Sequence, residues 1–250
     1  MHIIQHFLRI TLLSLFPVFA AAQDLLIGNV DIDINQTADI YSADIIGSVH
    51  FDADTKTLTL NNATLTNVLI QNNNVTWLNI CLKGENHITN KSGALFLLHP
   101  TKITGDGSLS TSCDMDYSDI YHESSLLVED CTIDVGIFRG VFNAFLEIRN
   151  ASVTSLHGIY WHSGVALKDC KIVQPVGGVY DENEHAVSLH GWIYKGKVVI
   201  ERIKPLSIDR IETNEEERMF FDMQGRLLSE PYKGICIIRY ADGRVKKVMR

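Results

Sequence analysis

Acidic side chains recur along this chain at intervals that would stack them on one another. Glu85, Asp106 and Asp130 are 21 and 24 residues apart, and Asp169 follows later. If each interval makes one turn of stacked strands, neighbouring carboxylates lie about 4.8 Å apart. Carboxylate pairs about 5 Å apart suit retaining glycosidases, and pairs two turns apart approach the separation found in inverting enzymes. The trio Glu85, Asp106 and Asp130 is therefore a candidate catalytic site of a polysaccharide hydrolase or lyase.

Two other interpretations of these acidic positions remain open. Asn62 and Asn150 occupy the same place in other segments, and Asp and Asn favour tight corners because of backbone geometry alone. The same carboxylates also offer the oxygen ligands that Ca²⁺ takes, so Ca²⁺ is the one cofactor that this pattern allows. No clear Arg or Lys stands nearby to act as the base of a lyase. We expect the corner role and no catalytic residue, with the carboxylate trio as the alternative.

A second acidic cluster lies in the segment 113–123, which reads CDMDYSDIYHE. Asp114, Asp116 and Asp119 are the candidate metal ligands in this segment, because carboxylate oxygens bind Ca²⁺. The segment lacks the glycine and the distal glutamate of a calcium-binding loop. We expect a solvated, protruding loop without a metal, and the three aspartates are the alternative.

An aromatic cluster stands at 158–164, GIYWHSG, and it is the candidate binding site. Tyr160, Trp161 and His162 are bracketed by glycines, and rings with an apolar body and a polar tip can lie against a sugar. The alternative is that Trp161 packs in the core. Trp77 and Trp192 have the same ambiguity.

The elements that would position these residues are repeated units. Each unit has a small anchor residue followed two places later by an aliphatic one, at intervals of 23, 21, 24, 20 and 19 residues. Repeats of this length with strand-like content predict a solenoid, in which each unit buries its apolar face against its neighbours. The six segments are LTLNNATL (58–65), ICLKGENHI (80–88), KITGDGSL (102–109), LLVEDCTI (126–133), LEIRNASV (146–153) and VALKDCKI (165–172).

The aliphatic pattern inside each unit predicts a corner between two strands. In four units aliphatic residues stand five and three places before the anchor and two places after it, and these positions cannot share one face of a straight strand. Asn or Asp ends the two-residue bend in four units, as expected for left-handed backbone geometry. The chain is therefore expected to be all-β: a right-handed parallel β-helix of about six coils with a short C-terminal β-tail. Cys131 and Cys170 are expected to pack inside the corner as free thiols, about 9.6 Å apart.

The composition and the first residues limit where the protein works. The net charge is −8, which argues against binding to nucleic acid. Residues 1–22 contain Arg9, a ten-residue apolar run and three alanines, the pattern of a signal peptide cleaved before Gln23. No segment is long enough for a transmembrane span. We expect an exported protein that is secreted or on the outer cell surface, with the periplasm as a further location.

The sequence resembles a family of exported β-helix proteins of gut and oral Bacteroidetes and some Firmicutes, often described as carbohydrate-binding-domain-containing or hypothetical. The resemblance covers most of residues 25–203, through LLIGNVDI, VHFDADTKTLTLNNATL, LKGENHIT, ITGDGSLS and the closing KIVQPVGGVYDENEHAVSLHGWIYKGKVVIERI. These motifs imply the fold and not an activity.

The end of the chain resembles part of the C-terminal sorting domains of Bacteroidetes. Its features are a DxxGR turn at Asp222, Gly225 and Arg226, then Lys233-Gly234 and the basic Lys246-Lys247. The stretch has about half the usual length, so a tail that docks on the last coil is the alternative. The expected organisation is a signal peptide (1–22), an N-terminal cap (23–57), the β-helix (58–203), a linker (204–218) and a sorting-like tail (219–250).

The function expected from these features is that of an exported, non-catalytic surface protein. Its partner would be a polysaccharide or another cell-surface component. A polysaccharide hydrolase or lyase that uses the stacked carboxylates, and a purely structural surface protein, are the two alternatives.

Overall fold

The computed structural model describes residues 23–114, 118–141, 143–203, 218–229, 234–240 and 244–249. These residues form 28 strands and no helix, so the described part of the chain is all-β and has no helix that could cross a membrane. The chain divides into two compact units, Met1–Ile203 and Lys204–Arg250. The predicted signal peptide, Asp116, almost all of the predicted linker and Lys233 lie outside the described residues.

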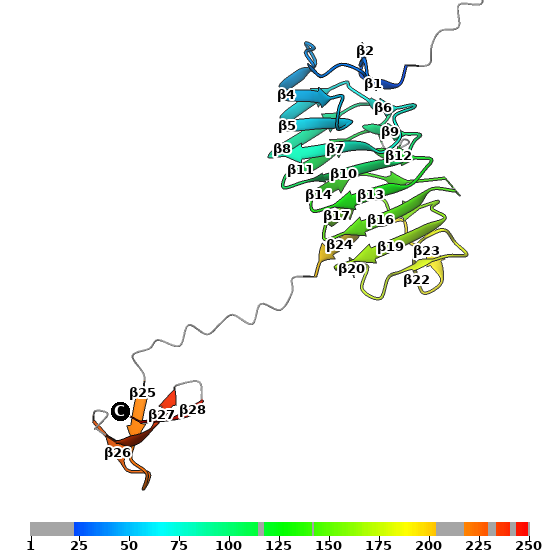
Figure 1. Cartoon of the computed structure of the whole chain (residues 1–250). Coiled ribbons are helices and arrows are strands. Elements are labelled where there is room, and N and C mark those ends of the chain that lie inside the picture. The colour runs from blue at the N-terminus through cyan, green and yellow to red at the C-terminus, as the bar shows by residue number, and fades with distance from the viewer. Residues whose placement is uncertain are drawn as a thin grey trace, which may run out of the picture. The chain divides into compact units, whose positions relative to one another are not determined.

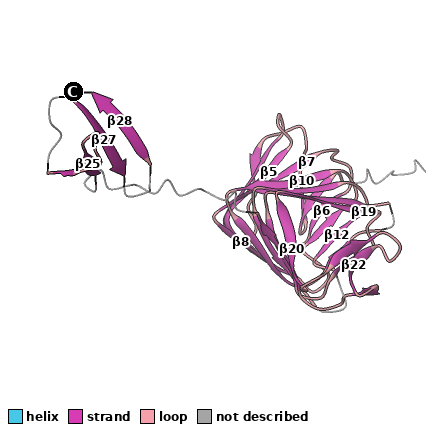
Figure 2. Ribbon diagram, turned by 90° about the horizontal axis from the view of Figure 1, so that it is seen from below, coloured by secondary structure: helices cyan, strands magenta, loops and turns pink. Residues whose placement is uncertain are grey.

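The larger compact part, Met1–Ile203, is a β-solenoid, in which parallel strands of successive coils stack into three faces (Figure 1). The first face contains the N-terminal half of β5 (Thr57–Thr66), β7 (Leu78–Lys83), β10 (Thr101–Gly105), β13 (Leu126–Glu129), β16 (Phe145–Arg149) and β19 (Gly164–Lys168). The second face contains the C-terminal half of β5, β8 (Glu85–Thr89), β11 (Ser108–Ser112), β14 (Thr132–Val135) and β17 (Ser152–Ser155). The third face contains β6 (Ile70–Asn72), β9 (Leu95–Leu97), β12 (Ile120–His122), β15 (Phe138–Arg139) and β18 (Ile159–Tyr160). Figure 2 shows these strands from another side, around a common interior.

The corner between the first and second faces confirms the predicted bend. Asn62, Asp130, Asn150 and Asp169 all have positive φ, between 43° and 58°. An L-residue with a side chain rarely adopts this conformation, and Asn and Asp tolerate it best. The alternating aliphatic residues on both sides of the bend are buried around Asn62, Asp130 and Asn150 and partly buried around Asp169, which is why the chain must turn at this point.

The strand register departs from the sequence alignment between the second and third repeats. Asn86 is level with the anchor Ala63, as aligned, but on its other side it lies opposite Leu109, and Gly107 stacks on Gly84. The amide of Asn86 reaches into the corner instead. Its Oδ1 accepts a hydrogen bond from the Ala63 N–H at 2.9 Å, and its Nδ2 donates to the Ser108 carbonyl at 3.1 Å. A buried, fully bonded asparagine thus replaces an aliphatic residue in the core.

The stack has about five complete coils and not the six expected. The sixth unit adds β19 to the first face, but its second strand, β20 (Cys170–Gln174), does not pair with β17. The antiparallel strand β24 (Val198–Arg202) inserts between them. The sequence pattern of the sixth unit is that of a coil, but strand pairing across the stack decides whether the coil closes.

Antiparallel strands cover the N-terminal coil and the last strand of the third face. At the N-terminus β1 pairs with β6, and β4 pairs with β5. At the other end β22 pairs with β18. Covering an exposed sheet edge hinders pairing with another chain. The strands at these ends are β1 (Leu25–Ile27), β2 (Val30–Asp31), β3 (Ala38–Asp39), β4 (Ile45–Asp52), β21 (Val179–Asp181), β22 (Ala186–Leu189) and β23 (Trp192–Ile193).

The core lies inside the solenoid, and the cysteines are part of it as predicted. Cys131 is fully buried and Cys170 is 5% exposed, and both are free thiols. Desolvation by burial is the first cause that raises the pKa of the Cys131 thiol to about 12. Both thiols therefore pack as small apolar groups and have little thiolate character.

The described residues of the C-terminal compact part, Lys204–Arg250, form a four-stranded antiparallel sheet in the order β26–β25–β27–β28. Asp222 closes its first turn: Oδ1 accepts hydrogen bonds from the Gln224 and Arg226 N–H groups at 2.9 Å, and Gly225 has a φ of 81°. The DxxGR motif is thus a turn that the aspartate holds together. The strands are β25 (Arg218–Phe221), β26 (Leu227–Leu228), β27 (Ile235–Tyr240) and β28 (Val245–Met249).

Candidate functional site

The structure brings together only part of the predicted carboxylate trio. Asp106 and Asp130 each lie two residues before Ser108 and Thr132, which face each other on neighbouring coils. Glu85 does not join them, because it lies opposite Ser108 itself. The three carboxylates are exposed, and the Asp130 Oδ1 accepts a hydrogen bond from the Asn150 amide at 2.7 Å. This geometry favours the corner interpretation.

The predicted metal ligands do not lie in one environment. Asp114 is exposed, whereas Asp119 is 3% exposed. Asp119 already accepts hydrogen bonds from the Thr111 hydroxyl at 2.5 Å and from the Ile137 N–H at 2.9 Å. Within the described ranges, no group of three His, Cys, Asp or Glu side chains could hold a metal ion. Because Asp116 lies outside these ranges, the three-aspartate alternative stays a prediction.

The residues of the aromatic cluster differ in direction: some side chains point out of the solenoid and one points into it. Tyr160 is partly exposed, Trp161 is 40% exposed, and His162 is fully buried. The ring of His162 lies inside the solenoid, 4.9 Å from the ring of His122 between centroids. The positive φ of Trp161, 66°, turns the chain so that the following residue points inward. Tyr160 and Trp161 can therefore contact a ligand outside the solenoid, and His162 cannot.

Tyr160 belongs to a row of outward-facing residues on the third face. We call the residues Phe96, Tyr121, Arg139 and Tyr160, together with Trp161, the third-face strip. In each of these short strands a buried apolar residue comes first and the next residue points outward, as strand alternation requires. The paired positions run from one coil to the next in the order Phe96, Tyr121, Arg139 and Tyr160.

The side chains of the strip pack against one another. The rings of Phe96 and Tyr121 stack with centroids 4.9 Å apart and an interplanar angle of 10°. The Arg139 guanidinium lies 3.6 Å from the centroid of the Trp161 ring. Three coil steps separate Phe96 from Tyr160, or about 14 Å. The strip is thus a continuous surface of rings and one guanidinium, long enough for several units of a polymer.

A groove of about 180 Å³ runs beside the strip. Apolar, hydroxyl-bearing and cationic side chains line it together, and no described lining residue is a carboxylate. Binding sites for small ligands have this mixture of apolar walls and a few polar groups. The lining residues are Leu69, Ser92, Gly93, Leu95, Phe96, Ser118, Tyr121 and Arg139.

The tyrosine hydroxyls of the strip are held in place and remain protonated. Tyr121 donates to the Glu123 carboxylate at 2.8 Å, and Tyr160 donates to the His157 carbonyl at 2.7 Å. Burial is the first cause that raises the pKa of both phenols above the ordinary value, and for Tyr121 the Glu123 carboxylate adds to it. Each ring is therefore fixed in orientation before a ligand arrives.

A second hollow, of about 390 Å³, lies in the N-terminal cap. Its wall includes Asp33 and Asp39, but these carboxylates already accept hydrogen bonds from Asn35 and His50. It has one ring, Tyr41, and no row of rings. The third-face strip is the better candidate site.

Sequence reasoning found Tyr160 and Trp161 but missed Phe96, Tyr121 and Arg139. The signal was present, because each of these residues follows an apolar residue that begins a third-face strand. These strands have only two or three residues. The intervals from Phe96 to Tyr121, Arg139 and Tyr160 are 25, 18 and 21 residues, which are too irregular to indicate a repeat.

Comparisons with protein-family models, with curated proteins and with solved structures found no match for this chain. The function must therefore be argued from the chemistry of the strip, the groove and the corner.

Proposed function

We propose that this chain is an exported, non-catalytic protein that binds glycans through the third-face strip. The observation that carries the proposal is the row of Phe96, Tyr121, Arg139 and Tyr160, which is in register over four coils and lies beside a groove with hydroxyl groups. Sugar rings have apolar C–H faces and polar rims. Aromatic rings with a polar tip complement both.

The absence of catalysis in this proposal rests on the placement of the carboxylates. Glycoside hydrolysis uses two carboxyl groups that flank the scissile bond. The groove lining has none among the described residues, and Asp130 at the corner has a backbone role and an amide partner. A ligand held on the third face would thus lie away from the acidic corner, which joins the other two faces.

The predicted signal peptide and the resemblance to exported β-helix proteins support a location outside the cytoplasm. We place the protein on the outer cell surface or in the secreted fraction, with the periplasm as a further location. A glycan of the surface or surroundings is the partner that fits this location.

The test compares two tryptophans in the same backbone conformation. Trp161 has a φ of 66° and lies in the strip, whereas Trp77 has a φ of 59°, is 56% exposed and lies outside it. Trp161→Ala should reduce retention on a bound polysaccharide about tenfold, as the loss of an aromatic anchor does. Its melting temperature should stay near that of the wild type, because the exposed cation–π contact contributes about 0.5–1 kcal/mol.

Trp77→Ala is the matched control and should retain the glycan. Equal loss in both variants, or loss of stability without loss of retention in Trp161→Ala, would contradict the strip as the binding surface. Failure of the wild-type protein to retain any glycan would favour the purely structural alternative.

A further inference from the structure

Arg139 is the cation of the strip, and no described residue neutralises it. Its Nε is buried and has no hydrogen-bond partner among the described residues. Its described contact is the Trp161 ring, which lies against the face of the guanidinium. The Nε atoms of Arg149 and Arg202 are also buried without a partner, so what sets Arg139 apart is its position in the lining of the groove.

Three cations on the first face, in contrast, have carboxylate partners. Lys102 pairs with Glu129 at 2.6 Å, Lys168 pairs with Glu147 at 2.8 Å, and Arg149 pairs with both glutamates. The chain has an excess of eight acidic charges, and it places carboxylates beside these cations. Arg139 differs from these three cations in that it lines the groove and has no carboxylate partner among the described residues.

Stacking on Trp161 prepares the guanidinium to bind a planar anion. The contact occupies one face of the group, and the two Nη atoms, unlike the buried Nε, are left to donate to a ligand. Those donors form a fork that matches the two oxygens of a carboxylate. Tyr121 and Tyr160, on either side of Arg139 in the strip, supply ring surface next to this fork.

We propose that Arg139 selects glycans that carry carboxylates, namely polysaccharides built of uronic acids. The inference rests on the proposed glycan binding and names the ligand class. A polymer of acidic sugars fits better than a glycan with a single terminal acid, because the strip extends about 14 Å over four coils. The ring surface would hold the sugar backbone, and Arg139 would hold the carboxylate of one unit.

The experiment uses two ligands that differ only at the carboxyl groups, which are ionised in one and methyl-esterified, and so uncharged, in the other. Calorimetric titration of the purified chain with an oligogalacturonate and with its methyl ester measures the contribution of the carboxylate. The wild-type protein should bind the acidic form about tenfold more tightly, the size expected for charge-assisted hydrogen bonds. Arg139→Gln should bind both forms equally, and Arg139→Lys, which keeps the charge without the fork, should retain part of the preference.

Lys171→Gln is the control for net charge, because Lys171 is exposed on β20 and lies outside the strip. It should keep the full preference, and a melting curve of each variant verifies that it is folded. Equal binding of the two ligands by the wild-type protein would overturn selection by Arg139 while leaving glycan binding intact. Binding of neither ligand would also overturn the uronic acid assignment, and retention of other glycans then decides separately whether glycan binding stands.

Discussion

Two buried imidazoles are the least expected residues of the solenoid interior. His122 and His162 are 1% and 0% exposed, and each contacts the ring of Phe138. The Nδ1 atom of His122 is 2.8 Å from the Ser124 carbonyl, whereas its Nε2 and both nitrogens of His162 have no partner among the described residues. Desolvation lowers the pKa of His122 to about 4 and also lowers that of His162. Both rings are therefore neutral in the folded chain near neutral pH.

These histidines make the stability depend on pH. A pKa that is lower in the folded chain than the ordinary 6.5 means that the unfolded chain binds the proton first. Stability is complete above pH 6.5 and falls as the pH drops toward 4, by about 3 kcal/mol for His122. His122→Leu, which places there the residue type of Leu97 on the preceding coil, should remove this part of the fall. Urea unfolding at several pH values measures it.

Phe138→Leu separates the charge effect from packing. This variant loosens the same cluster but keeps both imidazoles, so it should be less stable at every pH and retain the acid-dependent fall. If His122→Leu and the wild-type chain lost stability in parallel between pH 6.5 and 4, the assignment to His122 would be wrong.

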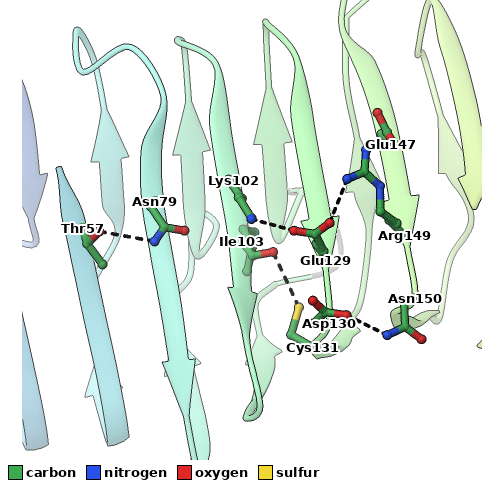
Figure 3. A network of polar contacts seen from close by, with 10 residues as sticks. All are labelled: Thr57, Asn79, Lys102, Ile103, Glu129, Asp130, Cys131, Glu147, Arg149 and Asn150. Carbon is green, nitrogen blue, oxygen red and sulfur yellow. Dashed lines mark hydrogen bonds and ion pairs between the residues drawn. The ribbon is translucent and has the colours of Figure 1, made fainter. Parts of the chain in front are cut away.

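At the scale of the strands, a network of charges joins four coils of the first face. It runs from Lys102 through Glu129, Arg149 and Glu147 to Lys168. Figure 3 shows its part from Lys102 to Glu147. The hydrogen bond from Lys102 is the first cause that lowers the pKa of Glu129, and that from Lys168 is the first cause for Glu147. Each charge has a partner on the neighbouring coil or strand position, so the network stabilises the stack and is not a ligand site.

The network should lose its contribution in acid. Each glutamate has a folded pKa below its ordinary 4.5, so its contribution is present above that pH and disappears as the pH falls through the folded value. Glu129→Gln should cost about 1 kcal/mol at pH 7, the upper range for an exposed pair. Below the folded pKa the difference from the wild type should vanish in urea unfolding. Asp134→Asn, on the second face, changes the net charge equally and should cost less than about 0.5 kcal/mol; equal costs would contradict the network.

The strands also show what the sequence could and could not predict. The corner was predictable because Asn62, Asp130 and Asn150 combine a steric requirement with alternating aliphatic residues. The role of Asn86 could not be predicted. Its amide makes hydrogen bonds to the backbone of the corner from a position where the next coil has the aliphatic side chain of Leu109. The insertion of β24 and the coupling of Trp161 to Arg139 depend on contacts across coils. Local residue spacing does not encode such contacts.

At the scale of the whole solenoid, the faces differ in their chemistry. The first face carries the network of paired charges, the corner follows backbone geometry, and the third face presents rings, a groove and a guanidinium without a carboxylate partner among the described residues. Antiparallel strands cover the first coil and the last strand of the third face. The third face is thus the one with features that packing alone does not require.

The most direct test of glycan binding is retention on a glycan array, with and without Ca²⁺, followed by product analysis of each glycan retained. The account predicts that the wild-type chain retains at least one glycan without cleaving it, with no need for Ca²⁺. It also predicts that Tyr121→Ala loses this retention while it stays folded. Cleavage of a retained glycan, or retention that is unchanged in Tyr121→Ala, would contradict the account.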